Sequence, residues 1–213
     1  MKETTKLIYD ALFERYPALT VSKNDVMAAY LVCEEVYRNG GKILVCGNGG
    51  SASDSEHIVG ELMKQFKKKR RIDEEIYDAL GAYGKDGEIM RERLEGNLPA
   101  ISLTSHLALT TAFANDTEPS LTFAQQLLGL GEEGDALISI STSGNSKNCV
   151  YATILAKVKG LKTISLTGEK ESRLSELSDV TVRVPESETY LIQEYHLPIY
   201  HALCAMLEEE FFQ

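Results

Sequence analysis

Hydrophobic positions alternate along the chain between helical spacing and short uninterrupted runs. Apolar residues recur every three or four positions in residues 3–17 and 22–39, which predicts two amphipathic helices. Five short apolar runs indicate buried strands: KILVC (42–46), PAISL (99–103), DALISIS (135–141), LKTISLT (161–167) and DVTVRV (179–184). Further helices are predicted at about 52–66, 105–115, 119–129, 146–159, 172–178 and 188–211.

Strands that alternate with helices usually pair in parallel through right-handed crossovers. We therefore predict an α/β fold, a Rossmann-like three-layer αβα sandwich around a five-stranded, largely parallel sheet. Two N-terminal helices (1–40) and a long C-terminal helix flank this core. We expect one domain over residues 1–213, because no internal repeat or Pro- or Ser-rich linker divides the sequence. Residues 67–98 are polar and charged, and we interpret them as a part-helical surface insertion rather than a functional lid.

The charge balance restricts the partners of the protein. Lys and Arg number 22 against 32 Asp and Glu, which gives a net charge of -10 and argues against bulk binding to nucleic acid or an anionic membrane. No apolar run approaches the roughly 20 residues that cross a bilayer, and the N-terminus lacks the apolar stretch of a signal peptide. The four cysteines lie far apart among apolar neighbours, so we expect buried free thiols and a reducing, cytoplasmic location.

The first candidate loop is GNGGS, residues 47–51, between a predicted strand and a predicted helix. Its glycines let backbone N–H groups approach an anion, and the helix N-terminus adds a favourable dipole. Residues 47–52 also match the dinucleotide fingerprint G-x-G-x-x-A. That interpretation requires a second strand directly after the helix, and the charged insertion follows instead. We therefore favour a phosphate site over a nicotinamide cofactor.

The second candidate loop is STSGNS, residues 141–146, which follows the third predicted strand and opens a helix. Four hydroxyl groups in six residues form a neutral cradle for a phosphate. The loop lacks the lysine of a P-loop, which argues against hydrolysis of a nucleoside triphosphate. Because both loops follow the carboxyl ends of strands, we expect them to share one crevice.

Titratable side chains lie on two of the predicted helices. His57 and Glu61 are four residues apart and share a helical face. On the last helix, Gln193 and His201 are eight residues apart and lie within about 80° of each other. His196 and His201 diverge by about 140°, so both cannot face one site, and the pattern alone does not choose between them.

These segments resemble the sugar isomerase (SIS) domain family, and within it the phosphoheptose isomerases. CGNGGSASDSEHIVGEL, ISISTSGNS, ISLTG and RVPESETYLIQEYHLPIYH carry the resemblance, which covers nearly the whole chain except residues 67–98. It implies a homotetramer with active sites between subunits. It also implies that both loops and nearby polar residues bind a sugar phosphate: Asn48, Gly49, Gly50, Ser51, Asn115, Asp116, Ser141, Thr142, Ser143, Ser146 and Gln193.

The resemblance also implies roles for the titratable residues. Glu61 matches the general base and His201 the general acid, so the resemblance selects His201 over His196. In zinc-containing members the ligands correspond to His57, Glu61, Gln193 and His201. Two departures bear on sugar specificity. The family's arginine falls on Gln65, and the insertion at 67–98 is longer than the usual connection; we expect both near the pocket.

We therefore expect a ketose–aldose isomerase that converts sedoheptulose 7-phosphate into D-glycero-D-manno-heptose 7-phosphate through an enediol, with zinc as a possible cofactor. The alternatives are a non-catalytic SIS module that binds a phosphosugar or a protein, and an isomerase of another phosphosugar. The presence of both pairs, His57 with Glu61 and Gln193 with His201, favours an enzyme. The basic run KQFKKKRR (64–71) precedes acidic residues, which predicts a salt-bridged surface rather than a nucleic-acid site.

Overall fold

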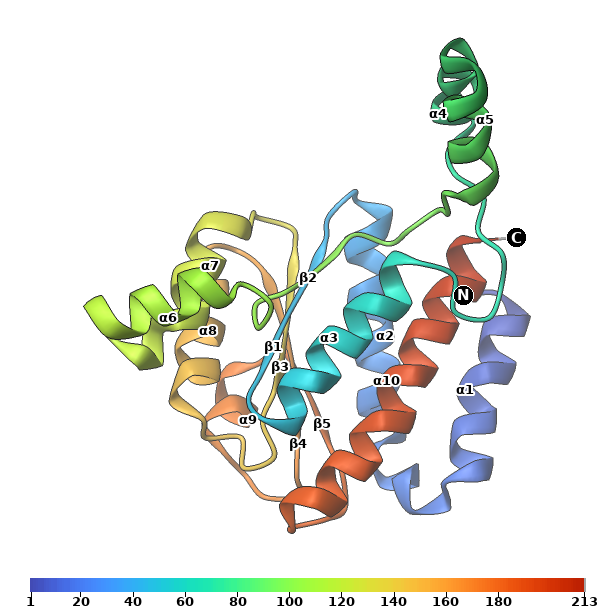
Figure 1. Ribbon diagram of the computed structural model, residues 1–213. Coiled ribbons are helices and arrows are strands. Elements are labelled where there is room, and N and C mark those ends of the chain that lie inside the picture. Colours follow the sequence, from blue (N-terminus) through green and yellow to red (C-terminus); the bar gives the residue numbers. More distant parts are fainter. Residues whose placement is uncertain (213) are drawn as a thin grey trace.

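Five parallel strands form the centre of the fold in the computed structural model, which describes residues 1–212 (Figure 1). The strand order is β2-β1-β3-β4-β5, and every neighbouring pair is parallel. The predicted α/β fold with a five-stranded parallel sheet is therefore confirmed. The strands are β1 (Ile43–Gly47), β2 (Ala100–Ser102), β3 (Ala136–Ile140), β4 (Lys162–Thr167) and β5 (Val180–Arg183).

Helices cover both faces of the sheet (Figure 1). One layer contains α1 (Glu3–Arg15), η1 (Pro17–Ser22), α2 (Lys23–Arg38), α3 (Gly50–Met63) and α10 (Thr189–Phe211). The other side carries α6 (Leu107–Asp116), η3 (Pro119–Leu121), α7 (Thr122–Leu130), α8 (Lys147–Val158) and α9 (Arg173–Leu177). None of the helices in residues 1–212 is long and apolar enough to span a membrane.

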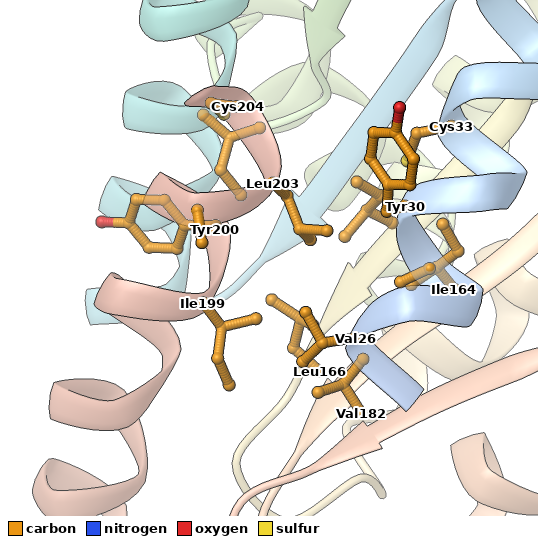
Figure 2. Close-up of a cluster of buried hydrophobic side chains, with 14 of the residues drawn as sticks. Val26, Tyr30, Cys33, Ile164, Leu166, Val182, Ile199, Tyr200, Leu203 and Cys204 are labelled. Carbon is orange, nitrogen blue, oxygen red and sulfur yellow. The ribbon is translucent and has the colours of Figure 1, made fainter. Parts of the chain in front are cut away.

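The sheet divides the hydrophobic core into two clusters because successive strand residues point to opposite faces. In β1, Ile43 and Val45 join the cluster beneath α2, α3 and α10, whereas Leu44 and Cys46 join the cluster beneath α7 and α8. Figure 2 shows the first cluster, in which side chains of α10, α2 and the strands meet. Each fully buried aliphatic side chain there stabilises the fold by about 1.5–3 kcal/mol, so α10 is held firmly against the sheet. All four cysteines are buried free thiols.

The predicted insertion forms a helical hairpin that projects from the body (Figure 1). Its elements are α4 (Glu74–Leu80), η2 (Gly81–Tyr83) and α5 (Gly84–Arg93). Among residues 74–93, only Gly87 is buried. A Cβ on Gly87 would lie 1.9 Å from the Leu80 carbonyl oxygen. Residues 74–93 are thus largely helical and exposed, whereas Arg70, Gly96 and Leu98 of the predicted insertion (67–98) are buried.

The position of the hairpin differs from the expected one. It leaves the body after the C-terminal end of α3 and returns to the start of β2. Both points lie at the edge of the sheet where the parallel strands begin, whereas GNGGS and STSGNS follow strand ends. We expected the insertion near the pocket. Within one chain the hairpin lies away from the phosphate loops, while Arg70 at its base donates to the Glu61 carbonyl oxygen across 2.8 Å.

Candidate active site

The two candidate phosphate loops lie side by side at one edge of the sheet. Strands β1 and β3 are neighbours, with Gly47 opposite Ile140, and the helices that follow them cover opposite faces. Ligands bind at such a topological switch point in open α/β sheets. Asn48 of the first loop exchanges two amide hydrogen bonds, of 2.9 and 2.8 Å, with Asn148 at the start of α8. The structure thus brings the loops together as predicted.

The tight geometry of GNGGS accounts for its glycines. A Cβ on Gly47 would lie 2.5 Å from the Ser51 carbonyl oxygen, and Gly49 has a φ of +57°, which favours glycine. Ser51 is buried on the first turn of α3. The loop therefore turns sharply from β1 into α3 and presents the start of that helix at the sheet edge.

Hydroxyl groups gather in the STSGNS loop. Ser141 Oγ donates to Ser146 Oγ across 3.0 Å, and the Asn145 backbone N–H donates to Ser143 Oγ across 3.2 Å. Gly144 has a φ of +65°, and a Cβ there would lie 2.0 Å from Ser172 Oγ. Ser143 is exposed and Thr142 half-buried, so the loop can present hydroxyl groups outward. Hydroxyl and N–H groups of this loop could bind a phosphate although the loop itself contains no lysine.

Helices α3 and α10 run side by side in the same direction. Their contacts occur in the same order along both helices, from the N-terminal to the C-terminal ends. Gln193 lies against Gly50, where a Cβ would come within 2.7 Å of its Nε2 atom. Further along, His201 contacts His57, with ring centroids 4.9 Å apart. Near the C-terminal ends, Glu208 accepts a hydrogen bond of 2.8 Å from the Phe66 backbone N–H. The pair therefore extends from the first phosphate loop towards the base of the hairpin.

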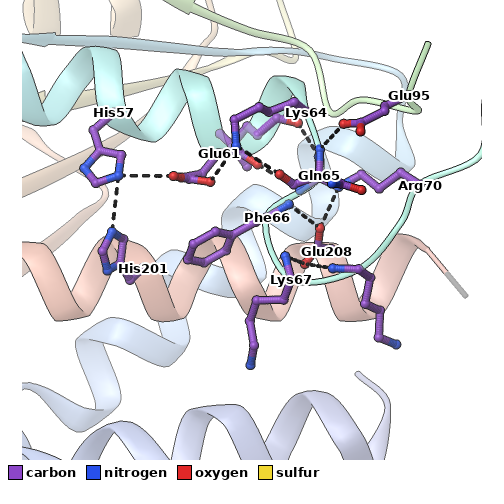
Figure 3. Close-up of polar contacts among 12 residues, drawn as sticks. His57, Glu61, Lys64, Gln65, Phe66, Lys67, Arg70, Glu95, His201 and Glu208 are labelled. Atoms are coloured by element: carbon purple, nitrogen blue, oxygen red, sulfur yellow. Dashed lines mark hydrogen bonds and ion pairs between the residues drawn. The ribbon is translucent and has the colours of Figure 1, made fainter. Parts of the chain in front are cut away.

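His57 stands between Glu61 and His201 in one polar row (Figure 3). Its Nε2 atom lies 3.1 Å from Glu61 Oε1 and 3.5 Å from His201 Nε2. Glu61 Oε2 also lies 3.5 Å from Lys64 Nζ. Burial, reinforced by the adjacent His57, lowers the pKa of His201 below its usual value. A carboxylate and two imidazoles thus meet on the shared face of α3 and α10.

The two candidate histidines of α10 have different surroundings. His196 is fully buried, and its Nε2 atom hydrogen-bonds the Thr167 carbonyl oxygen across 3.3 Å. Burial lowers its pKa to about 4, which keeps the ring neutral. His201, in contrast, lies beside His57. The structure therefore resolves the choice that the sequence pattern left open: His196 belongs to the core.

Two predicted substrate residues are remote from the loops in a single chain. Asn115 and Asp116 lie exposed at the end of α6, where Asn115 Nδ2 donates to Asp116 Oδ1 across 2.8 Å. Among the described residues, neither makes a hydrogen bond to GNGGS or STSGNS. Helix α6 contains no buried residue despite its apolar sequence, and Leu107 is 75% exposed. The structure does not join these two residues to the rest of the predicted site.

The predicted zinc ligands only partly converge. His57, Glu61 and His201 form the polar row, whereas the amide of Gln193 lies against Gly50. The atom separations of 3.1 and 3.5 Å in the row bracket the roughly 3.3 Å expected between neighbouring ligands of a tetrahedral zinc. As arranged, however, no group of three His, Cys, Asp or Glu side chains within residues 1–212 encloses a metal position.

Arg70 is the residue that sequence reasoning missed. The basic run predicts a salt-bridged surface, but Arg70 is 1% exposed. Its guanidinium donates to Glu208 Oε1, to the Leu62 carbonyl and to the Glu61 carbonyl at 2.8, 2.6 and 2.8 Å (Figure 3). It therefore caps the last turn of α3 and fixes the backbone that carries Glu61. The sequence contained one indication of this role: no glycine follows Met63 to cap the C-terminal end of α3, so another group had to bind the free carbonyl oxygens there.

Comparison with known proteins places this fold and site in one family. The SIS domain family matches residues 99–208, and a second SIS domain family matches residues 18–97. The phosphoheptose isomerase of a Nitratiruptor species is 40% identical over 186 residues, which cover 87% of this chain and 86% of that protein. The chain therefore belongs to the SIS domain family.

Solved structures agree with this assignment. A phosphoheptose isomerase from Francisella tularensis superposes with a TM-score of 0.74 at 31% identity, covering 98% of this chain and 100% of that one. The phosphoheptose isomerase of Neisseria gonorrhoeae gives a TM-score of 0.72 at 28% identity, covering 96% and 98%. Within the SIS domain family, the chain belongs with the phosphoheptose isomerases, which are enzymes.

Proposed function

We propose that this isomerase interconverts sedoheptulose 7-phosphate and D-glycero-D-manno-heptose 7-phosphate through an enediol. The observation that carries the proposal is the polar row of Glu61, His57 and His201 on the same helix pair that begins at the first phosphate loop. The names of the similar proteins support the choice of a heptose phosphate.

The phosphate would be held where the two loops meet. Hydroxyl groups of Ser51, Ser141, Thr142, Ser143 and Ser146 are candidates for direct contact, together with backbone N–H groups of the turns. Glu61 lies ten residues after Ser51, which corresponds to about 15 Å along α3. An extended phosphosugar could therefore place its phosphate at the loops and its reacting carbons nearer the row. Binding of the remote phosphate would supply energy that positions those carbons.

The row supplies the acid and base that an enediol mechanism requires. In the ketose-to-aldose direction, Glu61 would take the proton from the carbon next to the carbonyl. His201 would give a proton to the carbonyl oxygen, which yields the enediol. Glu61 would then deliver its proton to the former carbonyl carbon, and His201 would take the proton of the hydroxyl on the neighbouring carbon, which becomes the aldehyde of the aldose. Each well-positioned group of this kind contributes about 10²–10⁴-fold to the rate. His57, between the two, could relay protons that reset them.

Zinc fits the chemistry of the row as a proposed cofactor. His57, Glu61 and His201 would hold it, and Gln193 would have to leave Gly50 to supply a fourth ligand. When bound, zinc would act as a Lewis acid that stabilises negative charge on the enediolate oxygens. Metal analysis of the purified protein, before and after chelation, tests this part separately.

We further propose a cytoplasmic homotetramer in which another subunit completes each site. The exposed apolar residues of α6, Leu107 and Leu109, support burial against a neighbouring copy. Such a contact would also give Asn115 and Asp116 a site to join, which a single chain does not provide. Sedimentation equilibrium tests the assembly, and a monomeric active enzyme would contradict it.

The test of function is a panel of phosphosugars. The protein is assayed with sedoheptulose 7-phosphate, a pentulose phosphate, a hexulose phosphate and sedoheptulose without its phosphate. We expect the highest kcat/KM for sedoheptulose 7-phosphate and at least about a tenfold loss without the phosphate. A higher kcat/KM for a shorter phosphosugar would show that the substrate is not sedoheptulose 7-phosphate. Gln65, which replaces the family's arginine, is the reason to test shorter sugars.

A further inference from the structure

A cavity of about 790 Å³ lies at the base of the α4–α5 hairpin, which projects from the body (Figure 1). Residues 69–72, just before α4, line one part of it, and residues 91–94, at the end of α5, line another. The chain closes tightly beside it, since a Cβ on Gly96 would come within 2.4 Å of the Arg71 carbonyl oxygen. Sites for small molecules usually enclose roughly 300–1,000 Å³. The cavity therefore has the size of a ligand site, and it is separate from the two phosphate loops.

Cationic side chains from both segments line this cavity. Lys69 and Arg71 precede α4, and Arg93 ends α5. None of these three side chains forms an ion pair within residues 1–212, whereas Lys68 and Arg70, which alternate with them, pair with carboxylates of α10 (Figure 3). Folding thus brings three cations without counter-ions around one space. An anion bound there would relieve their mutual repulsion.

A fourth cation, Arg91, holds one wall of the cavity in place. Its Nε atom donates to the Tyr77 carbonyl oxygen across 2.6 Å, and its guanidinium carbon lies 4.2 Å from the centroid of the Tyr77 ring. Its Nη2 atom is 3.6 Å from Asp78 Oδ1, so its charge is already partly balanced. Helices of 7 and 10 residues are too short to be stable alone, and Arg91 ties α4 to α5. The wall that contains Tyr77 is therefore fixed by the hairpin itself.

Carboxylates and apolar side chains complete the lining. Glu74 and Glu92 contribute the carboxylates, and the apolar surface comes from Ile72, Tyr77 and Leu94. Arginine and lysine bind phosphate, and a carboxylate accepts hydrogen bonds from ribose hydroxyl groups in dinucleotide sites. An inorganic anion would leave the carboxylates and the apolar surface without a partner. The lining as a whole therefore fits an organic phosphate with hydroxyl groups and a ring better than a bare phosphate.

We propose that the cavity at the base of the hairpin binds a nucleotide, with its phosphate groups on Lys69, Arg71 and Arg93 and its ribose hydroxyl groups on Glu74 or Glu92. The volume exceeds what phosphate alone would fill, and the apolar surface gives the base a place to pack. A net charge of -10 disfavours a nucleic acid at the same cations. The proposal concerns binding alone and does not rest on the isomerase reaction.

Isothermal titration calorimetry of the full chain tests the proposal with ADP, CDP, GDP and UDP. We expect at least one of them to bind, and its nucleoside to bind at least about tenfold more weakly, because charge-assisted hydrogen bonds to the phosphates are lost. Arg71→Gln and Arg93→Gln should each weaken nucleotide binding by about tenfold or more. Both residues are exposed, so circular dichroism should show folded variants.

Two matched variants locate the bound nucleotide. Lys85→Gln removes an exposed cation of the same hairpin that does not line the cavity, and it should change the affinity by less than about twofold. Ser143→Ala alters the STSGNS loop and should also leave the affinity unchanged. A nucleotide lost in Ser143→Ala but kept in Arg71→Gln would lie at the phosphate loops and would overturn the proposal.

Three further results would also overturn it. The first is that none of the four nucleotides binds to the folded protein. The second is that inorganic pyrophosphate binds as tightly as the best nucleotide, because the carboxylates and the apolar surface would then have no role. The third is that duplex DNA, and no nucleotide, binds through Arg71 and Arg93, which would make the cavity part of a nucleic-acid surface.

Discussion

The α3–α10 pair and the α4–α5 hairpin contrast in how their side chains are held. In the pair, His57, Tyr200 and Arg70 are fixed by neighbours from distant parts of the sequence. In the hairpin, only Gly87 is buried between residues 74 and 93. Catalysis requires groups held in one orientation, which burial and hydrogen bonding supply. Within one chain, the helix pair therefore meets this requirement and the hairpin does not, in agreement with the proposed roles of Glu61 and His201.

The largest expected effect concerns the base. Glu61→Gln should lower kcat by about 10²–10⁴-fold, because the amide cannot accept a proton from carbon. Circular dichroism should show an unchanged fold. Glu88→Gln on the exposed hairpin is the control and should keep full activity. A Glu61→Gln enzyme as active as its control would remove Glu61 from the mechanism.

The next effect concerns the cap of α3. Arg70→Met should lower the free energy of unfolding by about 3–5 kcal/mol, because it leaves the buried carboxylate of Glu208 without its cation. Arg71→Met changes the exposed neighbour and should stay within about 0.5 kcal/mol. Denaturation with urea measures both. Equal stability of the two variants would show that Arg70 is not the cap described above.

The third prediction is a pH dependence from His196. Burial lowers its pKa from 6.5 to about 4 in the folded protein. As the pH falls below about 6.5, His196 binds a proton in the unfolded chain but stays neutral in the folded protein. Its contribution to the free energy of unfolding is therefore fully present above pH 6.5 and decreases down to about pH 4. The expected loss is about 3 kcal/mol, at 1.36 kcal/mol per pH unit.

A difference measurement isolates this histidine from the other titrating groups. The unfolding free energies of the unmodified protein and of His196→Gln are compared from pH 7.5 to pH 4. The loss should be smaller in the variant by roughly the same 3 kcal/mol. Parallel curves for the two proteins would contradict a neutral, buried His196.

The smallest effect is expected at the hairpin. The backbone closes beneath it, where the Gly96 N–H donates to the Arg70 carbonyl across 3.2 Å. Replacement of residues 73–93 by a short Gly-Ser linker should therefore preserve the fold and keep kcat/KM within about twofold. A cavity of about 790 Å³ at the base, lined by Lys69, Arg71 and Arg93 among others, would be lost. Loss of activity would show that the hairpin serves the site, as a lid or across a subunit contact.

The sequence predicted the elements of the fold because their patterns are local. The five apolar runs all became strands, and the glycines of GNGGS indicated a turn whose backbone crowding requires them. The proximity of the two loops followed from the rule that parallel strands end at one edge. Local pattern and topology together were therefore sufficient for the sheet and its loops.

Contacts between distant segments were not predictable in the same way. Nothing in the run KQFKKKRR distinguishes Arg70 from its neighbours, because its burial depends on Glu208, 138 residues away. The choice between His196 and His201 required the register of α10 against α3. The contacts of Tyr200 with Asp54 and His57 also depend on that register. Residue spacing within one helix contains no information about it.

Direct observation of the product tests the central claim. The purified protein is incubated with sedoheptulose 7-phosphate, with and without added zinc, and the sugar is followed by NMR. We predict conversion to D-glycero-D-manno-heptose 7-phosphate. No conversion by folded protein that still binds the phosphosugar would contradict the proposed reaction and indicate another phosphosugar or a binding role.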